Sequence, residues 1–313
     1  MVKKLLKKKF LNKFNLPFVI IYCLIILASY FISGFFLFEW VISFMPYLIL
    51  LNLILLISLL KKRRIYVAVF LLIVTVIFTF RFIDFSFVKP QEGKGSIPLT
   101  ITFFNKHYLN KEYGEIEKAV KKIDPQILGI AEMDSKDEGK MKFLQSFQYR
   151  KIITSKDKFT TGIYSKYPME FLDLNKKELP HVIGANTMIE NKSYYVFIIH
   201  TNNSLNPSSN TDRDKELETL ISYINKLPTQ DNILLMGDLN LTQWSPVYRR
   251  IFDKNGILVD TAKGRGIITS WGPPILRSQI DHIFVTKNVR VDSLKTEFVK
   301  GSDHYLIWSI IRI

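Results

Sequence analysis

The first third of the chain carries long apolar runs separated by short polar segments. The runs cover roughly residues 17–38, 41–60 and 65–80. A helix needs about 20 apolar residues to cross a hydrocarbon core about 30 Å thick, and the third run reaches that length only if it continues past Arg81. A cleaved signal peptide would contain one such run. The pattern therefore predicts a membrane anchor with three transmembrane helices in residues 1–88.

Two residues interrupt the second run. Pro46 predicts a kink and Asn52 predicts a helix–helix contact, and a transport site is the alternative interpretation of both.

Positive charge predicts how this anchor is oriented. Six lysines precede the first run, and the sequence KKRR at residues 61–64 separates the second run from the third. The link between the first two runs contains Glu39 and no basic residue. Because positively charged loops stay in the cytoplasm, we expect a cell-membrane protein with a cytoplasmic N-terminus. Three spans would then place the rest of the chain on the extracytoplasmic side of the lipid bilayer.

The net charge of +15 is concentrated in the anchor. Residues 1–84 contain eleven Lys or Arg and two acidic residues, which leaves 32 basic and 26 acidic residues for the remainder, a charge of only +6. Nucleic-acid binding therefore cannot be inferred from the total charge. The single cysteine, Cys23, lies in the first run, so the remainder contains neither disulfides nor a catalytic thiol.

A polar segment separates the anchor from the rest of the chain. Residues 89–98 read KPQEGKGSIP, with two glycines and two prolines, and predict a linker. The 215 residues from 99 to 313 are enough for one large hydrophobic core.

Apolar runs and helical spacing in this part predict an α/β fold. The predicted strands cover residues 98–104, 127–130, 149–153, 161–165, 194–199, 233–236, 279–286 and 305–313. Helical spacing predicts helices at residues 112–122 and 211–227.

The strand at residues 233–236 ends in the sequence MGDLN. Its apolar residues predict a strand buried on both faces, and Gly237 marks the turn before Asp238 and Asn240. A carboxylate can accept a proton or face a metal ion, and a carboxamide can hold a phosphate oxygen. Taken alone, this sequence is more typical of a plain turn than of a catalytic site.

Other predicted strands also end in polar residues. Glu132 follows a buried run, where an unpaired carboxylate is costly, and suits a hard divalent cation. The others are Asn105, His200, Asp281, Asp303 and His304. Each alone could be a strand-end residue in water, but so many Asp, Asn, Glu and His residues at strand ends are not expected by chance and predict a functional site.

The ordered set of motifs resembles the endonuclease/exonuclease/phosphatase superfamily, which includes pancreatic-type deoxyribonucleases, abasic-site endonucleases, sphingomyelinases and inositol-polyphosphate phosphatases. The resemblance covers residues 99–313. Its motifs are FFN (103–105), DPQILGIAE (124–132), TGIYSKYP (161–168), IIH (198–200), MGDLNLTQWSP (236–246), IDHIF (280–284) and GSDH (301–304). Residues 201–207, TNNSLNP, depart from the pattern of a histidine closely followed by prolines, which leaves the substrate preference open.

The resemblance implies a four-layer α/β sandwich, with two mainly antiparallel sheets flanked by helices. It implies a Mg²⁺ site, with Mn²⁺ as the alternative ion, whose ligands are Glu132, Asn105 and Asp303. It implies that His304 acts as general base or phosphate-stabilising imidazole, oriented by Asp281, while Asp238 handles the attacking water or the leaving group. Asn240 and His200 would hold phosphoryl oxygens.

Three functions remain open at this point. The first is a membrane-anchored phosphodiesterase or phosphatase that acts on a lipid head group or another extracytoplasmic phosphoester. The second is an anchored nuclease, which should have a basic groove. The third is a binding protein with an inactive site.

Overall fold

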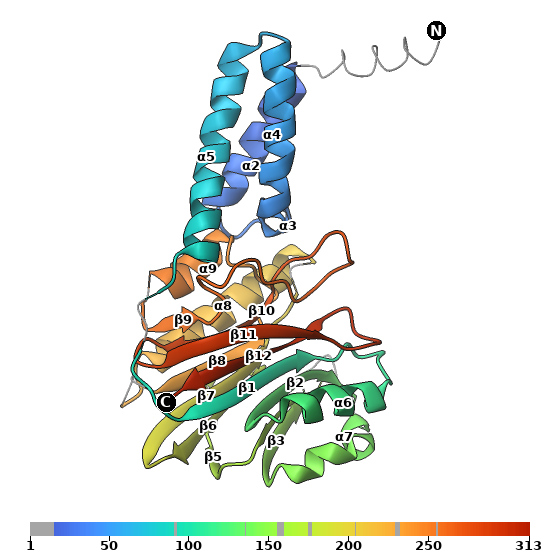
Figure 1. Cartoon of the computed structure of the whole chain (residues 1–313), viewed down its shortest axis with the longest axis vertical. Coiled ribbons are helices and arrows are strands. Elements are labelled where there is room, and N and C mark those ends of the chain that lie inside the picture. The colour runs from blue at the N-terminus through green and yellow to red at the C-terminus, as the bar shows by residue number, and fades with distance from the viewer. Residues whose placement is uncertain are drawn as a thin grey trace.

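The computed structural model describes residues 16–90, 93–134, 136–154, 160–174, 177–203, 205–228, 232–254 and 256–313. Three helices form a stalk that stands on a compact α/β domain (Figure 1). The lysine-rich start of the chain lies outside the described residues.

The stalk consists of α2 (Leu16–Phe31), α4 (Met45–Lys61) and α5 (Ile65–Phe87), with the short helix α3 (Phe36–Ser43) at its base (Figure 1). In the described part of the chain, α5 is the one single helix long and apolar enough to cross a membrane. The pair α2 and α3 passes that test only as one broken span, because it bends by 100°, and α4 has 17 residues. The prediction of three transmembrane helices is therefore supported only in part.

Two residues explain why the apolar runs and the helices differ. Gly34 has φ +87°, a conformation that other residues rarely adopt, and it separates α2 from α3 inside the first predicted run. Pro46 lies in the first turn of α4, where its missing N–H costs nothing, and the second predicted run is interrupted just before it, at Phe44 between α3 and α4. Asn52 accepts a hydrogen bond of 2.6 Å from the hydroxyl of Tyr22, which confirms the predicted helix–helix contact.

The last turns of α5 pack directly against the α/β domain. Arg81 forms an ion pair of 2.6 Å with Asp253. The amide of Gly264 donates to the carbonyl of Phe85 at 2.8 Å, and the ring of Phe85 meets Trp244 edge-on. The stalk is thus fixed to the domain by the helix itself.

The segment predicted to be a linker is also bound to the domain where it is described. The amide of Lys94 donates to the carbonyl of Asn288 at 3.1 Å, and Ile97 and Ile313 exchange backbone hydrogen bonds. A side chain at Gly93 would collide with the backbone of Asn288. This tight pairing leaves no freely moving linker in residues 93–97.

Two six-stranded sheets form the centre of the domain. The first has the order β11-β12-β1-β2-β4-β3 and the second β5-β6-β7-β8-β10-β9. The pairs β1–β2 and β7–β8 are parallel, and the other pairs are antiparallel. Strand bounds are β1 (Pro98–Asn105), β2 (Ile127–Met133), β3 (Tyr149–Thr154), β4 (Thr160–Ser165), β5 (Met169–Phe171), β6 (Val182–Ile189), β7 (Lys192–His200), β8 (Ile233–Asp238), β9 (Leu258–Asp260), β10 (Asp281–Thr286), β11 (Arg290–Phe298) and β12 (Tyr305–Arg312).

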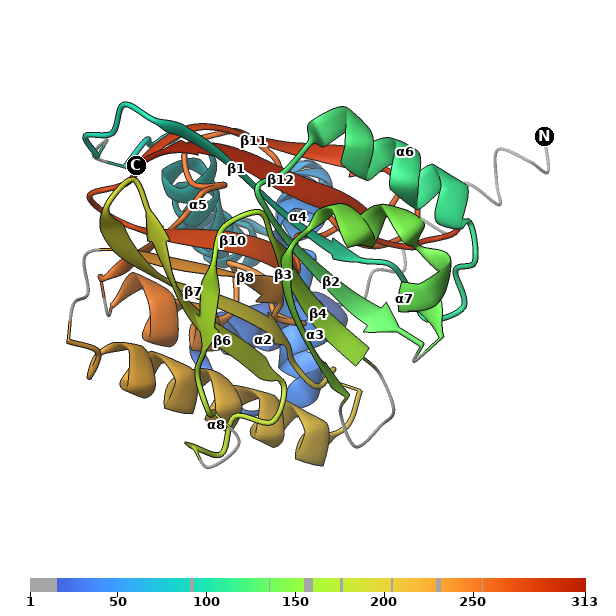
Figure 2. The ribbon, with the colours of Figure 1, turned by 90° about the horizontal axis from the view of Figure 1, so that it is seen from below.

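Helices cover the outer faces of the two sheets. Figure 2 shows α6 (Tyr113–Ile123) and α7 (Asp137–Lys140) on one side and α8 (Pro207–Ile224) on the other. The short helix α9 (Pro246–Tyr248) lies beneath α5 (Figure 1). This arrangement of two mixed sheets between helices agrees with the predicted sandwich.

Candidate active site

The strand register of the second sheet places three predicted site residues side by side. Asp238 at the end of β8 lies opposite His200 on the parallel strand β7 and opposite Asp281 on the antiparallel strand β10. Because paired residues point to the same face of a sheet, all three side chains meet at one edge.

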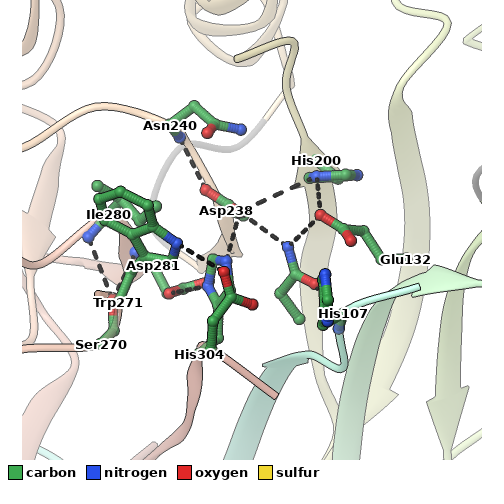
Figure 3. Close-up of polar contacts among 12 residues, drawn as sticks. His107, Glu132, His200, Asp238, Asn240, Ser270, Trp271, Ile280, Asp281 and His304 are labelled. Atoms are coloured by element: carbon green, nitrogen blue, oxygen red, sulfur yellow. Dashed lines mark hydrogen bonds and ion pairs between the residues drawn. The ribbon is translucent and has the colours of Figure 1, made fainter. Parts of the chain in front are cut away.

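The first sheet contributes the other half of the site. Nδ2 of Asn105, at the end of β1, lies 2.9 Å from Oε1 of Glu132 on β2 and 3.0 Å from Oδ2 of Asp238 on β8. This amide therefore joins the carboxylates of the two sheets. Nε2 of His200 lies 3.6 Å from Glu132 and 3.9 Å from Asp238 (Figure 3).

Glu132 has an unusual backbone conformation. Its φ is +56°, at an irregularity in the pairing of β2 with β4. The loop after β1 holds the site in place, because Tyr108 donates its amide to Oε2 of Glu132 and His107 donates its amide to Oδ1 of Asn105. His107 also has a positive φ, of 62°. Such conformations cost on the order of 1–3 kcal/mol each and persist where surrounding contacts fix them, often at functional sites.

His304 and Asp281 form a buried pair at the other side of Asp238. Nδ1 of His304 lies 2.8 Å from Oδ2 of Asp281, and its Nε2 lies 3.8 Å from Oδ2 of Asp238 (Figure 3). Burial alone would lower the pKa of His304, but the charge and hydrogen bond of Asp281 outweigh burial and raise it to about 10. The hydroxyl of Ser270 accepts the amide of Asp281 at 3.0 Å and so fixes the start of β10.

Burial also shifts the pKa of Asp238 and of His200. The pKa of Asp238 is raised to about 7, first by burial and then by the nearby charge of Asp281. The pKa of His200 is lowered, mainly by burial. A carboxylate whose pKa lies near neutrality can accept a proton in catalysis.

Asn240 and Asp303 are placed less centrally than predicted. Nδ2 of Asn240 donates to the carbonyl of Thr201, and its backbone amide donates to Oδ1 of Asp238 at 2.8 Å. Asp303 is exposed and accepts a hydrogen bond of 3.0 Å from Nε1 of Trp271. Within the described part of the chain, no hydrogen bond or ion pair joins Asp303 to Asn105 or Glu132. The structure thus unites seven of the eight predicted residues by direct contacts and leaves Asp303 at the rim.

The donor set fits a hard divalent cation. The ligand atoms of Asp238, Asp281 and His304 lie within 4.8 Å of one another, and Oδ1 of Asp281 is buried without a hydrogen-bond partner. Glu132 offers a further carboxylate at the cavity wall. Oxygen ligands of this kind suit Mg²⁺ or Mn²⁺, and the imidazole of His304 is already bound to Asp281.

Six of the eight predicted site residues line a cavity with an empty volume of about 1110 Å³, open solvent at its mouth included, and Asp281 and Asn105 lie behind them. Its wall also contains residues that the sequence did not point to, namely Glu39, Trp40 and Phe44 from the base of the stalk, His181, and Trp271. His181 pairs with Glu216 at 2.8 Å. In the sequence, Trp271 is only an isolated tryptophan in a loop, which is a weak indication of a site residue. The apolar runs gave no indication that residues 39–44 lie at a catalytic site. Asn202 and Asn203, in the loop that departs from the family pattern, also line the cavity.

A buried ion pair behind the site was also missed. Nζ of Lys106 lies 2.9 Å from Oδ2 of Asp137, and both side chains are fully buried. Lys106 also donates to the carbonyls of His107 and Asn110 at 3.0 Å. Because residues 107 and 108 hold Asn105 and Glu132, this pair stabilises the loop that positions them.

Comparison with known proteins defines the class of the molecule. Residues 105–304 match the Endonuclease/Exonuclease/phosphatase family, which covers more than half of the chain. The protein therefore belongs to this family and is an enzyme of the metal-dependent phosphoesterase and nuclease class. No curated protein sequence matches the chain significantly.

Solved structures share the fold at low sequence identity. A humanized D. rerio TDP2 with 14 mutations is 17% identical with a TM-score of 0.58, and the match covers 70% of this chain and 100% of that one. A family protein from Bacteroides vulgatus is 17% identical with a TM-score of 0.56, over 70% and 100%. The mannosyl-6-phosphatase Bt3783 of Bacteroides thetaiotaomicron is 17% identical with a TM-score of 0.53, over 69% and 100%. At this identity these matches show the sandwich fold and do not transfer a substrate.

Proposed function

We propose that the protein is a membrane-anchored, Mg²⁺-dependent hydrolase of phosphoesters, with the catalytic domain on the extracytoplasmic side. The observation that carries the chemistry is the contact network in which Asn105 joins Glu132 to Asp238, beside the buried pair of His304 and Asp281. A hydrolase of this class needs a metal site, a base for water and donors toward the phosphate, and the network supplies residues for each.

The residues divide these tasks by position. Glu132, with Asn105 beside it, would hold the Mg²⁺ ion, which offsets negative charge on a nonbridging phosphate oxygen when bound. Asp238 lies between Asn105, His200 and His304 and is placed to accept the proton of the attacking water. His304, held by Asp281, presents its Nε2 to the same space and donates a hydrogen bond to the phosphate.

The reaction conserves atoms and charge. The oxygen of water forms a bond to phosphorus while the ester P–O bond breaks, and the leaving alkoxide takes up a proton to become an alcohol. Asp238 receives the proton from water, and His200 and Asn240 contact phosphate oxygens. No cysteine takes part, because the one thiol, that of Cys23, lies in the stalk.

The cavity wall favours a small or membrane-borne phosphoester over a nucleic-acid strand. Four acidic side chains line the cavity, and in the described part of the chain no lysine or arginine does. Binding along a nucleic-acid backbone requires basic contacts. A nuclease thus remains the second candidate, supported only by the family and the shared fold.

The stalk supports the membrane location. Its outward side chains are large and apolar, for example Ile21, Leu24, Ile54, Ile73 and Phe80, all of them exposed. Water would disfavour such a surface, whereas lipid would cover it. The chain turns from α4 to α5 at the end of the stalk far from the domain (Figure 1). That turn carries the KKRR sequence, so a cytoplasmic turn places the domain outside.

A hydrolysis panel with the purified full-length chain in detergent tests this proposal. Bis(p-nitrophenyl) phosphate, phospholipids, DNA and RNA are compared with Mg²⁺ and with EDTA. We expect Mg²⁺-dependent cleavage of phosphoesters with phospholipids ahead of nucleic acids. Cleavage confined to DNA or RNA would select the nuclease, and full activity in EDTA would contradict the metal site.

A further inference from the structure

The base of the stalk forms one wall of the catalytic cavity. Glu39, Trp40 and Ser43 of α3, together with Phe44, line the same cavity as Glu132 and His304. The ring of Trp40 meets that of Trp271 edge-on at 6.4 Å, and Trp271 donates to Asp303 beside His304. The connection between the first two stalk helices is therefore part of the catalytic centre.

Glu39 is an unusual residue at this position. Its side chain is 96% buried, and its Oε1 has no hydrogen-bond partner among the described residues. Leaving a buried carboxylate oxygen unpaired is costly, so a buried acceptor that lines a cavity indicates a donor on a ligand.

Arg213 lies nearby in the interior, and its positive charge favours the ionised form of Glu39. Its guanidinium is hydrogen-bonded to Asp214, to the side chain of Asn210 and to the carbonyl of Asn240. Among the described residues, no hydrogen bond reaches Oε1 of Glu39 from this arginine or from any other donor.

A second, largely apolar cavity of about 690 Å³, open solvent at its mouth included, adjoins the first, and Ser43 and Ser278 line both. It lies between α4 and the loop before β10, and its wall includes Pro46, Leu50 and Ile267. Leu50 is 59% and Ile267 64% exposed. The second cavity thus adjoins the catalytic cavity at Ser43 and Ser278 and reaches Leu50 on the outward apolar face of α4.

The loop that forms the other wall is fixed to α4. The hydroxyl of Tyr47 accepts the amide of Arg277 at 2.9 Å, and it lies 3.2 Å from the carbonyl of the same residue. Ile275 and Leu276, at the tip of this loop, are exposed. Figure 1 shows the loop between β9 and β10 beside α3, at the level where the stalk meets the domain.

We propose that these two cavities together bind a membrane phospholipid whose head group ends in a hydrogen-bond donor. The phosphate lies at Glu132 and His304, the amine or hydroxyl of the head group binds Oε1 of Glu39, and the acyl chains follow the groove along α4. This inference rests on the proposed function, and it names the substrate class of the same site. The bond that breaks is a P–O ester bond of the lipid, with water supplying the oxygen and a proton passing to the leaving alcohol.

The test uses the full-length chain in mixed micelles with Mg²⁺ and four phosphodiesters. Phosphatidylethanolamine offers an ammonium donor, phosphatidylglycerol offers hydroxyl donors, and phosphatidylcholine with the same acyl chains offers neither. Glycerophosphoethanolamine has the donor but no acyl chains. We expect kcat/KM for at least one of the two donor-bearing lipids to be at least tenfold higher than kcat/KM for phosphatidylcholine. It should also be at least tenfold higher than kcat/KM for glycerophosphoethanolamine. A comparison of the two donor-bearing lipids then shows whether the donor is an amine or a hydroxyl.

The variant Glu39→Gln should lower the ratio of kcat/KM between the preferred lipid and phosphatidylcholine at least tenfold. The control variant Glu115→Gln alters an exposed residue of α6 and should leave that ratio unchanged. Equal wild-type rates on phosphatidylcholine and the donor lipids would overturn the inference, whether or not the Glu39 variant folds. An equal loss on all lipids in Glu39→Gln would indicate a structural role and would also overturn it.

Two further outcomes separate this inference from the proposed function. Hydrolysis of bis(p-nitrophenyl) phosphate without hydrolysis of any lipid would overturn the inference and leave the proposed function standing. An absence of hydrolysis on every phosphoester would overturn both.

Discussion

Nδ1 of His304 lies 2.8 Å from Oδ2 of Asp281, and both side chains are buried. The Asp281 carboxylate accepts a hydrogen bond from the protonated Nδ1, favours the protonated imidazolium and keeps Nε2 directed at Asp238. The two residues come from β10 and from the turn before β12, which belong to different sheets. Their contact therefore connects the two halves of the sandwich at the reacting centre.

The first prediction follows from this pair. His304→Ala and Asp281→Ala should each lower kcat/KM about 10²-fold or more, since both disable the same imidazole. The double variant should be barely worse than either single variant, because the two changes remove one function. Steady-state kinetics on bis(p-nitrophenyl) phosphate measure this, and additive losses would show that Asp281 does not act through His304. His200→Ala should be milder, about tenfold, if it only contacts phosphate.

The second prediction concerns the metal site. Glu132→Gln keeps the size of the side chain and removes its charge, so it should lower Mg²⁺-dependent activity about 10²-fold or more and weaken Mn²⁺ binding. Activity assays and Mn²⁺ titration by electron paramagnetic resonance measure the two effects. The matched variant Glu115→Gln alters an exposed carboxylate and should change neither. Unchanged Mn²⁺ affinity in Glu132→Gln would indicate that the metal ion binds instead to the group formed by Asp238, Asp281 and His304.

The sequence predicted the catalytic centre better than its surroundings. Asn105, Glu132, His200 and Asp238 lie at or near the ends of strands that are buried along most of their length. The parallel pairing of β1 with β2 and of β7 with β8 brings these strand ends together. Of the predicted strands, all eight are present, whereas β5, β6, β9 and β11 were missed. β11 lies at a sheet edge and most of its side chains are exposed or half-buried, so it lacks the apolar signal of a central strand.

Contacts between distant segments could not be predicted. Glu39 was only the acidic residue between two apolar runs, and its place in the cavity depends on the 100° bend after α2 and on how α5 docks. Lys106 and Asp137 are 31 positions apart, and no sequence motif connects them, yet they are fully buried together. Tertiary packing determines the position of Glu39 and the pairing of Lys106 with Asp137, and local sequence patterns do not contain that information.

The third prediction concerns this buried ion pair. Asp137→Asn leaves the ammonium of Lys106 buried without a carboxylate, so at pH 7 the free energy of unfolding should fall by about 3–5 kcal/mol. Urea unfolding of the full-length chain in detergent, followed by tryptophan fluorescence, measures the change. Glu138→Gln is a neighbouring control on α7 and should cost less than about 1 kcal/mol.

The same pair predicts a dependence on pH. Burial alone would raise the pKa of Asp137, but hydrogen bonds from Tyr113 and from the amide of Asp134, together with Lys106, lower it to about 2. Because the pKa of Asp137 is lower in the folded state, Asp137 stabilises the protein at pH values above its unfolded-state pKa of 3.8. This stabilisation is lost as the pH falls toward 2. The difference in the free energy of unfolding between wild type and Asp137→Asn should therefore shrink by on the order of 2 kcal/mol between pH 5 and pH 2. A difference that stays constant over this range would contradict the assignment.

The last prediction concerns the orientation of the protein in the membrane. Cys23 is the one cysteine of the chain, so Cys23→Ser gives a background free of thiols into which single cysteines can be placed. Lys118→Cys lies on an exposed position of α6 in the catalytic domain, and Lys62→Cys lies in the KKRR turn at the far end of the stalk. A membrane-impermeant maleimide should label Lys118→Cys in intact cells, whereas Lys62→Cys should react only after the cells are permeabilised. Labelling of Lys62→Cys alone in intact cells would place the catalytic domain in the cytoplasm, and cytoplasmic nucleic acid would then become the better substrate candidate. Labelling of both positions in intact cells would mean that α5 does not cross the membrane, which would contradict the three-span topology but not the chemistry of the site.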